Sequence, residues 1–484
     1  MILRELLSDY PSLKITGDSD IIVSGVNHDS RKVRKNDLFV AVNGFNSNGH
    51  KYISAAIENG AVCIIIENDI EPLPGITYVL VEDTSDALSY ICSRFYNDPS
   101  HDLFMRGITG TNGKTSTSYF IKNILNANNI NTGIIGTIGG IIDEDLIKLE
   151  NTTPDSLVIN HNLRKMLDSN INNCVMEVSS HALDLKRVSH IKYDIAIFTN
   201  LTKDHLDYHK TMENYYLSKL KLFYQSTKCN IINVDDIYGN RIINDVGSRV
   251  ELVTYGINNK ADVFATDISY SIDKVNFKLN RYDEGLYVTL NIPGIFSVYN
   301  SLAAAACCIA MGIDLNTIKI GLENITGIKG RFEVLPINKD FTVIIDFAHT
   351  SDGLEKVLTV IDQFAEGRKI IVFGAGGNRD KTKRPEMGLT VGLHSDLAIV
   401  TSDNPRFENP IKIIDDIIEG IKQTKVEYRV IVDRKEAIEF ALRNAMPKDI
   451  VLLAGKGHET YTIIGENTYP FDERQIVLNY LKEL

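Results

Sequence analysis

The sequence of 484 residues has no long apolar run, no cysteine framework and no excess of basic residues. No stretch approaches the ~18 consecutive apolar residues of a membrane-spanning helix, so we expect no membrane association. The first seven residues mix charged and apolar side chains, which is not the pattern of a signal peptide. The six cysteines have neither metal-binding nor redox spacing, which indicates reduced thiols in a cytoplasmic protein.

The charge balance is acidic, with 51 Lys and Arg against 63 Asp and Glu, or −12 at neutral pH. Nucleic acids are bound through basic surfaces, so this balance argues against a nucleic-acid partner. It leaves room for a small anionic substrate held by a few local cations. The composition is that of an ordinary globular protein, and the length exceeds what one hydrophobic core supports, so we expect about three domains.

A glycine-rich stretch at residues 107–116 has the composition of a phosphate-binding loop. It follows an apolar run that ends at Ile108 and precedes a segment compatible with a helix. Backbone N–H groups at a helix start can face an anion, Lys114 can reach the terminal phosphates, and Thr115 can hold Mg²⁺. The strict pattern G-x-x-x-x-G-K-[ST] is not met, because its first glycine falls on Ile108. We predict a nucleotide site, with a ligand-free glycine turn as the alternative.

Alternating apolar runs and helical patterns predict an α/β fold in three domains. Residues 1–103 form an N-terminal α/β module, and residues 104–332 form a central P-loop α/β domain with a small β meander. Residues 333–484 form a C-terminal Rossmann-like α/β domain with a mostly parallel sheet covered on both faces. A hinge is expected at residues 327–330. Strands are predicted at residues 21–26, 37–42, 61–66, 174–178, 194–199, 230–234, 262–269, 275–279, 286–290, 342–346, 369–373, 397–400, 429–432 and 449–453, and one long helix at residues 297–311.

Polar residues follow two predicted strands of the central domain. Glu177 ends an apolar strand and is suited to Mg²⁺ on a nucleotide, although a capping or surface glutamate is the alternative. Residues 204–209 contain two Asp and two His, which fits a second cation site or a catalytic cluster as well as an exposed helix start. Lys219 lies in a helical pattern, whose periodicity alone predicts a solvent-exposed side chain.

Three loops after predicted strands of the last domain carry both Arg and Glu. An Asn-Pro turn exposes Arg406 at the end of one strand, where it is suited to bind a carboxylate in bidentate fashion. Glu459 follows another strand and Arg379 a third. This combination fits an amino acid, which carries both charges. The loop at residues 374–380 is glycine-rich but departs from G-x-G-x-x-G, so a dinucleotide site is the weaker alternative.

In their order along the chain, these motifs resemble the Mur ligase family. They are residues 109–115, 177–181, 200–209 and 330–333. Residues 29–31, 151–153, 403–406 and 455–459 are similar, more narrowly, to the branch that adds the third residue of the peptidoglycan stem peptide. The resemblance extends from about residue 22 to about residue 475.

The resemblance implies an ATP-dependent ligase of cytoplasmic peptidoglycan-precursor synthesis, and a monomer. ATP would phosphorylate the terminal carboxylate of UDP-N-acetylmuramoyl-L-alanyl-D-glutamate, and an amine would then attack the acyl phosphate. The Asp-Asn-Pro-Arg pattern at residues 403–406 is associated with meso-2,6-diaminopimelate. A lysine-adding ligase of the same branch is one alternative. A folylpolyglutamate synthetase-like ligase would lack the N-terminal module and this pattern, and a P-loop switch or kinase would not need the loop at residues 455–459.

The same resemblance implies roles for individual residues. The ATP-binding residues would be Gly110, Thr111, Asn112, Gly113, Lys114, Thr115, Ser116, Asn300, Arg331 and Asp346. A first Mg²⁺ would be held by Thr115 and Glu177 and a second by His205, and a carbamylated Lys219 would be a further Mg²⁺ ligand. The catalytic residues would be Lys114, Lys219, His205 and Glu177. The UDP-linked substrate would contact His28, Ser30, Phe45, Asn46, Ser47, Asn151, Thr152, Thr153, Ser179 and Arg187, and diaminopimelate would contact Arg379, Asp403, Asn404, Pro405, Arg406, Gly455 and Glu459.

This chain departs from the family's pattern in a few places. Ser218 replaces the usual Ala before the carbamylated lysine, a change between small residues. Leu185 stands where some members have a glutamine that contacts the UDP-linked substrate, and leucine cannot make that polar contact.

Overall fold

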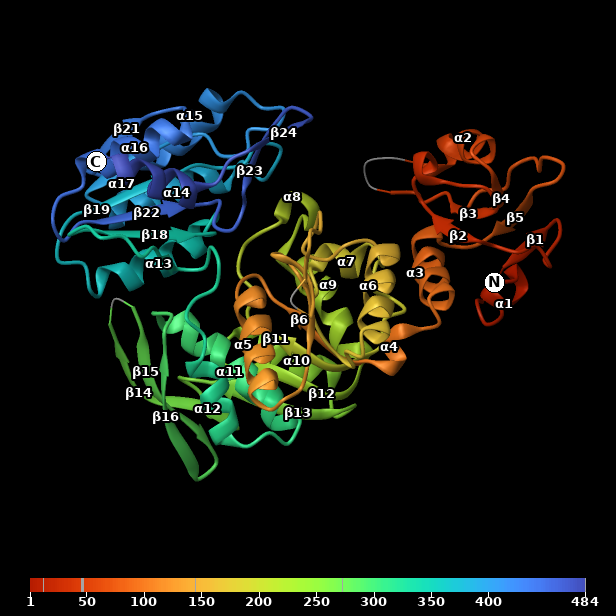
Figure 1. Ribbon diagram of the computed structural model, residues 1–484, viewed down its shortest axis with the longest axis horizontal. Coiled ribbons are helices and arrows are strands. Elements are labelled where there is room, and N and C mark those ends of the chain that lie inside the picture. Colours follow the sequence, from red (N-terminus) through yellow and green to blue (C-terminus); the bar gives the residue numbers. More distant parts are fainter. Residues whose placement is uncertain (12, 45–47, 144, 272, 484) are drawn as a thin grey trace.

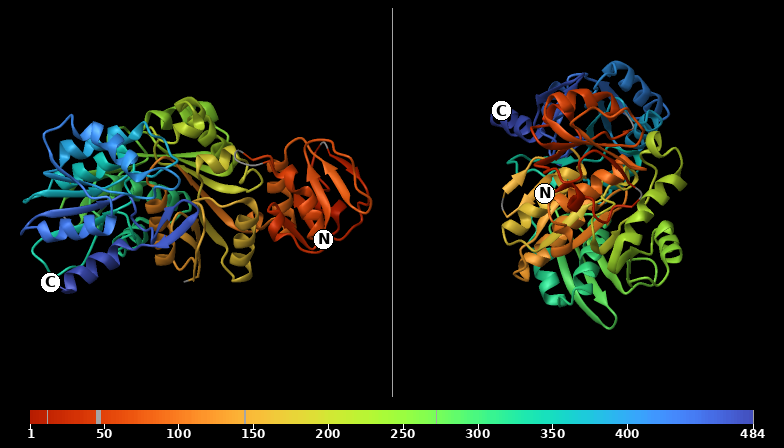
Figure 2. Two further views of the ribbon diagram at one scale, coloured as in Figure 1. Left: turned by 90° about the horizontal axis from the view of Figure 1, so that it is seen from above. Right: turned by 90° about the vertical axis from the view of Figure 1, so that its right-hand side faces the viewer.

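The structure is a computed structural model, and it describes the chain except residues 12, 45–47, 144, 272 and 484. Three α/β domains lie in a row, with the N-terminal domain at one end and the central domain between the other two (Figure 1). A second view shows the same order, with the N-terminal domain set apart from the other two (Figure 2). The predicted three-domain α/β fold is confirmed.

The N-terminal domain is a five-stranded sheet with helices on both faces. Its elements are α1 (Leu3–Leu6), β1 (Lys14–Thr16), β2 (Gly25–Asn27), the 3-10 turns Ser30–Lys32 and Gly49–Tyr52, β3 (Asp37–Val40), α2 (Ile53–Glu58), β4 (Ala61–Ile66), β5 (Thr77–Leu80), α3 (Thr84–Phe95) and α4 (Pro99–Asp102). The strand order is β1-β5-β4-β3-β2, with only β1 antiparallel to its neighbour. Alternate residues of β4 enter two separate hydrophobic clusters, because successive side chains of a strand point to opposite faces. The strand predicted at residues 21–26 is shorter and later, as β2.

The central domain is built on an eleven-stranded sheet. Its elements are β6 (Phe104–Thr109), α5 (Lys114–Ala127), β7 (Gly133–Gly136), β8 (Gly139–Ile142), β9 (Asp145–Ile147), α6 (Ser156–Asp168), β10 (Asn173–Glu177), α7 (Ser180–Asp184), β11 (Tyr193–Phe198), α8 (Leu206–His209), α9 (Met212–Gln225), β12 (Ser226–Asn233), α10 (Ile237–Val246), β13 (Glu251–Gly256), β14 (Val263–Tyr270), β15 (Val275–Arg281), β16 (Glu284–Leu290), α11 (Ile295–Ala310) and α12 (Leu315–Glu323). β6 lies between β10 and β11 and is parallel to both, so their carboxyl ends share one edge.

Helices cover both faces of this central sheet. Ile195 and Ile197 of β11 pack in a cluster with α5, α11 and α12, whereas Ala196 and Phe198 pack in a second cluster with α6 and α9. The predicted meander is present as β14 to β16. It is continuous with the main sheet, because β14 pairs in parallel with β13, a strand that the sequence did not predict.

The C-terminal domain has a six-stranded sheet covered on both faces. Its elements are β17 (Glu333–Val334), β18 (Thr342–Asp346), α13 (Ser351–Asp362), β19 (Lys369–Phe373), α14 (Lys383–His394), β20 (Leu397–Val400), α15 (Pro410–Ile421), β21 (Glu427–Val430), α16 (Arg434–Asn444), β22 (Ile450–Ala454), β23 (Tyr461–Ile464), β24 (Asn467–Pro470) and α17 (Glu473–Glu483). The order is β17-β18-β22-β19-β20-β21, with β17 antiparallel and the rest parallel. β23 and β24 form a separate hairpin.

The loops that carry the predicted site residues follow parallel strands of the central and C-terminal sheets. In an open parallel sheet, ligands bind beyond the carboxyl ends of the strands. No helix in the described part of the chain combines the length and apolar character that crossing a bilayer demands.

Candidate functional site

The phosphate loop follows β6 and opens directly into α5. Gly110 and Gly113 have φ angles of +153° and +88°, in the region that favours glycine. A Cβ atom on Gly113 would lie 2.3 Å from Asn300 Oδ1, and one on Gly110 would lie 1.8 Å from Thr199 Oγ1. No side chain caps α5, so its first N–H groups are available to an anion.

Lys114 is the first residue of α5 and is folded back over the loop. Its Nζ donates to the carbonyl oxygens of Gly110 and Thr111 at 2.8 and 2.9 Å. Burial lowers the pKa of the Lys114 ammonium below its usual value. A phosphate group would give this buried cation an anionic partner in place of two neutral carbonyls.

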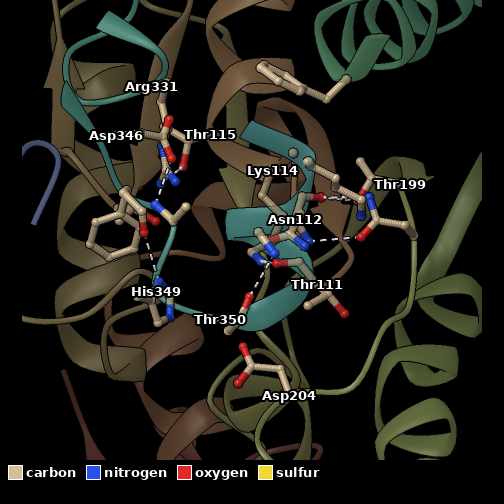
Figure 3. A pocket seen from close by; sticks show the side chains of 18 of the residues that line it. Thr111, Asn112, Lys114, Thr115, Thr199, Asp204, Arg331, Asp346, His349 and Thr350 are labelled. Carbon is tan, nitrogen blue, oxygen red and sulfur yellow. Dashed lines mark hydrogen bonds between the residues drawn. The ribbon is translucent and has the colours of Figure 1, made fainter. Parts of the chain in front are cut away.

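The carboxylate of Glu177 lies beside the loop, at the end of β10. Its Oε2 accepts from Thr115 Oγ1 and Thr137 Oγ1, each at 2.9 Å, and its Oε1 accepts from the Thr137 backbone N–H. Arg331 also donates to Thr115 Oγ1, at 3.1 Å (Figure 3). Hydroxyl and carboxylate oxygens are the donors that Mg²⁺ prefers, so Thr115 and Glu177 fit a hard cation shared with a nucleotide phosphate.

His205 lies next to Asp204 in the loop before α8. Its Nε2 is 3.5 Å from an Asp204 carboxylate oxygen. The described residues contain no group of three or more His, Cys, Asp or Glu side chains arranged to hold a metal. A Mg²⁺ ion here would therefore depend on few protein ligands and on substrate phosphates, which is its common mode in nucleotide enzymes.

Lys219 is buried, so the prediction from periodicity that its side chain is exposed to solvent is wrong. Only 2% of the residue is exposed. Its Nζ donates to the Gly110 carbonyl oxygen at 2.9 Å and lies 4.6 Å from the centroid of the Tyr215 ring. Burial, and then the nearby Lys114 charge, hold the pKa of Lys219 well below its usual value. The amine therefore lies under the phosphate loop and favours its neutral form.

Asp346, His349 and Thr350 of the C-terminal domain lie across from the loop (Figure 3). Asp346 ends β18, and its carboxylate accepts from the backbone N–H groups of Phe332 and Ala348 at 2.7 Å each. Burial raises the pKa of Asp346. The two domains also touch directly, because Asn112 Nδ2 donates to Asp352 Oδ2 at 2.8 Å.

The loops predicted to bind an amino acid come together at the carboxyl edge of the C-terminal sheet. Lys456 is 1% exposed, and its Nζ lies 3.3 Å from Asp403 Oδ1, 3.1 Å from Asn404 Oδ1 and 3.6 Å from Glu459 Oε2. Asn404 Nδ2 donates to Glu459 Oε2 at 2.9 Å. Burial alone would raise the pKa of Asp403, but nearby positive charges, that of Lys456 first, lower it overall. Burial, and then the charge of Asp403, raise the pKa of Glu459. The loop thus presents carboxylates whose charge is partly balanced from behind.

One cavity of about 680 Å³ joins the two sets of loops. This volume is within the range of small-molecule sites. The predicted residues that line it are Thr111, Asn112, Gly113, Lys114, Thr115, Ser116, Thr152, Glu177, His205, Asn300, Arg331, Asp346, Arg379, Asp403, Asn404, Arg406, Gly455 and Glu459. The predicted residues that do not line it are Gly110, Lys219, Pro405, His28, Ser30, Asn151, Thr153, Ser179 and Arg187.

The residues predicted for the UDP-linked substrate lie toward the N-terminal domain. His28 Nε2 is 3.7 Å from Asp155 Oδ2, which joins the first two domains near Ser30. Thr153 Oγ1 donates to the Glu177 carbonyl oxygen at 2.8 Å, and Arg187 donates to the Thr153 carbonyl oxygen at 3.1 Å. The predicted residues Phe45, Asn46 and Ser47 lie outside the described residues.

Several residues of the site were not predicted. Thr137 and Asp352 carry no sequence signal, because each acts through a partner that is distant in the chain. Lys456 lies between two glycines in a loop that the sequence did single out, yet nothing local indicates that its side chain turns inward.

The geometry of Gly113 yields a direct prediction. Gly113→Ala should weaken ATP binding about tenfold or more, because a left-handed backbone and a clash with Asn300 oppose the loop conformation. Gly312→Ala is the matched control, since Gly312 has a φ of +81° but no atom within 4 Å of its Cβ position. Titration with a fluorescent ATP analogue measures both dissociation constants. Equal values for the two variants would contradict the role of the loop.

Comparisons with known proteins place the whole chain in context. Three family models match it in succession: "Mur ligase family, catalytic domain" over residues 22–96, "Mur ligase middle domain" over residues 108–308, and "Mur ligase, glutamate ligase domain" over residues 330–457. A UDP-N-acetylmuramoyl-L-alanyl-D-glutamate--2,6-diaminopimelate ligase of Caldanaerobacter subterraneus subsp. tengcongensis is 47% identical over 470 residues, 97% of each chain. The enzyme with the same name in Clostridioides difficile is 44% identical over 487 residues, covering 100% of both.

Solved structures show the same architecture. A structure of a UDP-N-acetylmuramoyl-L-alanyl-D-glutamate--2,6-diaminopimelate ligase aligns with a TM-score of 0.71 at 30% identity, covering 100% of this chain and 99% of that one. A Mycobacterium tuberculosis folylpolyglutamate synthase with ADP and AMPPCP aligns with a TM-score of 0.64 at 15% identity, but over 77% of this chain and 92% of that one. At that identity the likeness concerns the fold alone.

Proposed function

The chain belongs to the Mur ligase family, and we propose that it joins meso-2,6-diaminopimelate to UDP-N-acetylmuramoyl-L-alanyl-D-glutamate at the expense of ATP. The observation that carries this proposal is one cavity with the phosphate loop on one wall and Arg379, Arg406 and Glu459 on another. Diaminopimelate has an ammonium and a carboxylate at each end, so it suits a pocket that offers both signs of charge. The names of the full-length relatives support the same substrate.

In the first step, ATP phosphorylates the terminal carboxylate of the UDP-linked substrate. A carboxylate is a poor electrophile, and the acyl phosphate gives it a leaving group. Two anions must approach each other, and Lys114 and Arg331 supply positive charge between them. We assign one Mg²⁺ to Thr115 and Glu177 and a second to His205 and a carbamylated Lys219, where the two ions would neutralise charge on the phosphates.

In the second step, the amine attacks the acyl carbon and phosphate leaves from a tetrahedral intermediate. We assign the far carboxylate of diaminopimelate to Arg406 and Arg379, and its ammonium groups to Asp403 and Glu459. Since Lys456 lowers the pKa of Asp403, that carboxylate remains charged for an ammonium group. Holding the amine next to the activated carboxylate converts a bimolecular step into an intramolecular one.

The proposal gives each domain one reactant. Residues 1–103 would hold the uridine nucleotide, residues 104–332 the ATP, and residues 333–484 the amino acid. The junction of His28 with Asp155 supports the first assignment, because it links the N-terminal module to the predicted substrate residues around Thr153. We also propose a monomer that acts in the cytoplasm, in keeping with six buried cysteines that form no disulfide.

The substrate test is a competition between two amino acids. The purified protein is given ATP, Mg²⁺, the UDP-linked dipeptide and equal concentrations of meso-diaminopimelate and L-lysine, and products are separated by mass spectrometry. The diaminopimelate product should exceed the lysine product by on the order of 10²-fold, because lysine would leave Arg406 without a carboxylate partner.

The outcomes of this competition separate the alternatives. A preference for L-lysine would replace the substrate and keep the ligase. No product with any amino acid, together with ATP hydrolysis, would favour a P-loop switch. Product from a folate and glutamate would favour a folylpolyglutamate synthetase-like ligase.

A further inference from the structure

Two arginines that line the amino-acid pocket lie on separate loops. Arg379 lies in the loop after β19, and Arg406 lies in the loop after β20. Burial, and then the charge of Arg379, lower the pKa of Arg406. In the described part of the chain neither guanidinium forms an ion pair, and Arg406 donates to the carbonyl oxygens of Gly377 and Asn404 at 3.0 and 3.4 Å. Because like charges repel, the two loops need a tie between them.

The ion pair between Arg384 and Glu408 holds the two loops together. Arg384 of α14 is 1% exposed, and its Nη1 and Nη2 lie 3.1 and 3.0 Å from the two carboxylate oxygens of Glu408. Glu408 belongs to the Arg406 loop, yet its Oε1 accepts from the Asn378 backbone N–H of the Arg379 loop at 2.5 Å. Arg384 Nη2 also donates to the Gly376 carbonyl oxygen at 3.3 Å. The pair therefore holds the backbone of one loop against the other.

Further contacts show that the two loops fit each other closely. Gly377 N–H donates to the Asn404 carbonyl oxygen at 2.9 Å, and Phe407 N–H donates to Asn378 Oδ1 at 3.1 Å. A Cβ atom on Gly377 would lie 1.9 Å from the Pro405 carbonyl oxygen. Asn378 and Arg406 have φ angles of +52° and +51°, which are unfavourable for residues other than glycine. Such a backbone persists only where surrounding contacts hold it.

We propose that Arg384 and Glu408 are positioning residues that set the spacing of Arg379 and Arg406, and so select an amino acid with a carboxylate at its far end. The inference rests on the proposed function and names residues that touch no substrate. It follows from the placement of the pair, which bonds to the backbone of the Arg379 loop at Asn378, next to Arg379, and at Gly376. Each of these bonds has one ionised partner, which makes it stronger than a hydrogen bond between two neutral groups.

A second carboxylate on Arg384 provides the control. Asp416 of α15 accepts from Arg384 Nη1 at 2.8 Å, and its carboxylate bonds to no other side chain or loop among the described residues. Both Glu408 and Asp416 balance the charge of Arg384, and Glu408 alone links the loops. A general stabilising role predicts similar effects from neutralising either one, whereas a positioning role predicts an effect from Glu408 alone.

The test compares Glu408→Gln with Asp416→Asn in the full-length enzyme. Glu408→Gln should raise KM for diaminopimelate about tenfold or more, with KM for ATP changed less than about twofold. The ratio of kcat/KM for diaminopimelate to kcat/KM for L-lysine should fall by a similar factor. Lysine has no carboxylate at its far end, so misplaced arginines do not weaken its binding. Asp416→Asn should change each quantity less than about twofold.

A loss of activity that leaves the preference ratio unchanged would overturn the inference, since damage to the fold affects both substrates alike. Asn378→Gly is a second variant, at an exposed position, that removes the side-chain bond to Phe407 and keeps the backbone N–H that bonds to Glu408. It should shift the same ratio in the same direction by a smaller amount. If the wild-type enzyme makes no diaminopimelate product, the proposed function fails; if it does and no variant changes the ratio, the positioning role fails.

Discussion

Lys114→Met is expected to lower kcat/KM for the ligation by about 10³-fold, the effect seen when a preorganised charge is removed from a phosphoryl-transfer site. The Lys114 side chain is half-buried, and its ammonium donates to two loop carbonyls at the start of a helix that no side chain caps. Methionine keeps the length of the side chain and removes its charge. The acyl-phosphate step should suffer most, because it brings two anions together.

Lys122→Met is the matched control for this variant. Lys122 is on the same helix, two turns further on, where its Nζ donates to the Thr132 carbonyl oxygen. Its replacement changes the net charge equally, and kcat/KM should stay within about twofold. Steady-state kinetics with a phosphate-release readout measures both. Similar losses in the two variants would show that net charge, rather than the place of Lys114, matters.

The strands that support the site were predictable from sequence because they are buried in parallel sheets. Such strands read as continuous apolar runs, and the runs predicted at residues 174–178, 194–199, 342–346 and 449–453 are strands β10, β11, β18 and β22. Other strands were missed, among them β9, at an edge of the central sheet, and β13, inside it between β12 and β14. Both begin with exposed residues, and they are strands because neighbouring strands supply their hydrogen bonds, which no local pattern records.

Individual loops of the site were predictable, but their meeting was not. Asn112 and Asp352 are 240 residues apart, and their hydrogen bond exists only because two separately folded domains touch. The burial of Lys219 has the same origin. Periodicity places it on a helix, but the phosphate loop that covers its amine comes from a strand more than a hundred residues earlier. Resemblance to a family supplied a role for this residue, and packing supplies its physical reason.

Loss of the Lys219 amine should be as damaging as loss of Lys114. We predict that Lys219→Met lowers kcat by about 10³-fold and leaves the dissociation constant for ATP within about threefold. A protonated amine at this place would repel both Mg²⁺ and Lys114, whereas a carbamate, formed from the neutral amine and CO₂, would present oxygen ligands. Burial lowers the pKa of Lys219 and so favours the neutral amine that this reaction needs.

The carbamate makes activity depend on CO₂, and this separates it from an ordinary packing role. Enzyme prepared in CO₂-free buffer should lose activity and regain it with bicarbonate, and more bicarbonate should be needed as the pH falls and the amine is protonated. Lys221→Met is the control, because Lys221 lies on the same helix but pairs with Asp184 at 3.0 Å with 46% of its side chain exposed. Full activity without CO₂, together with full loss in Lys219→Met, would assign Lys219 to packing against Gly110 and Tyr215. The second Mg²⁺ would then have no ligand from Lys219.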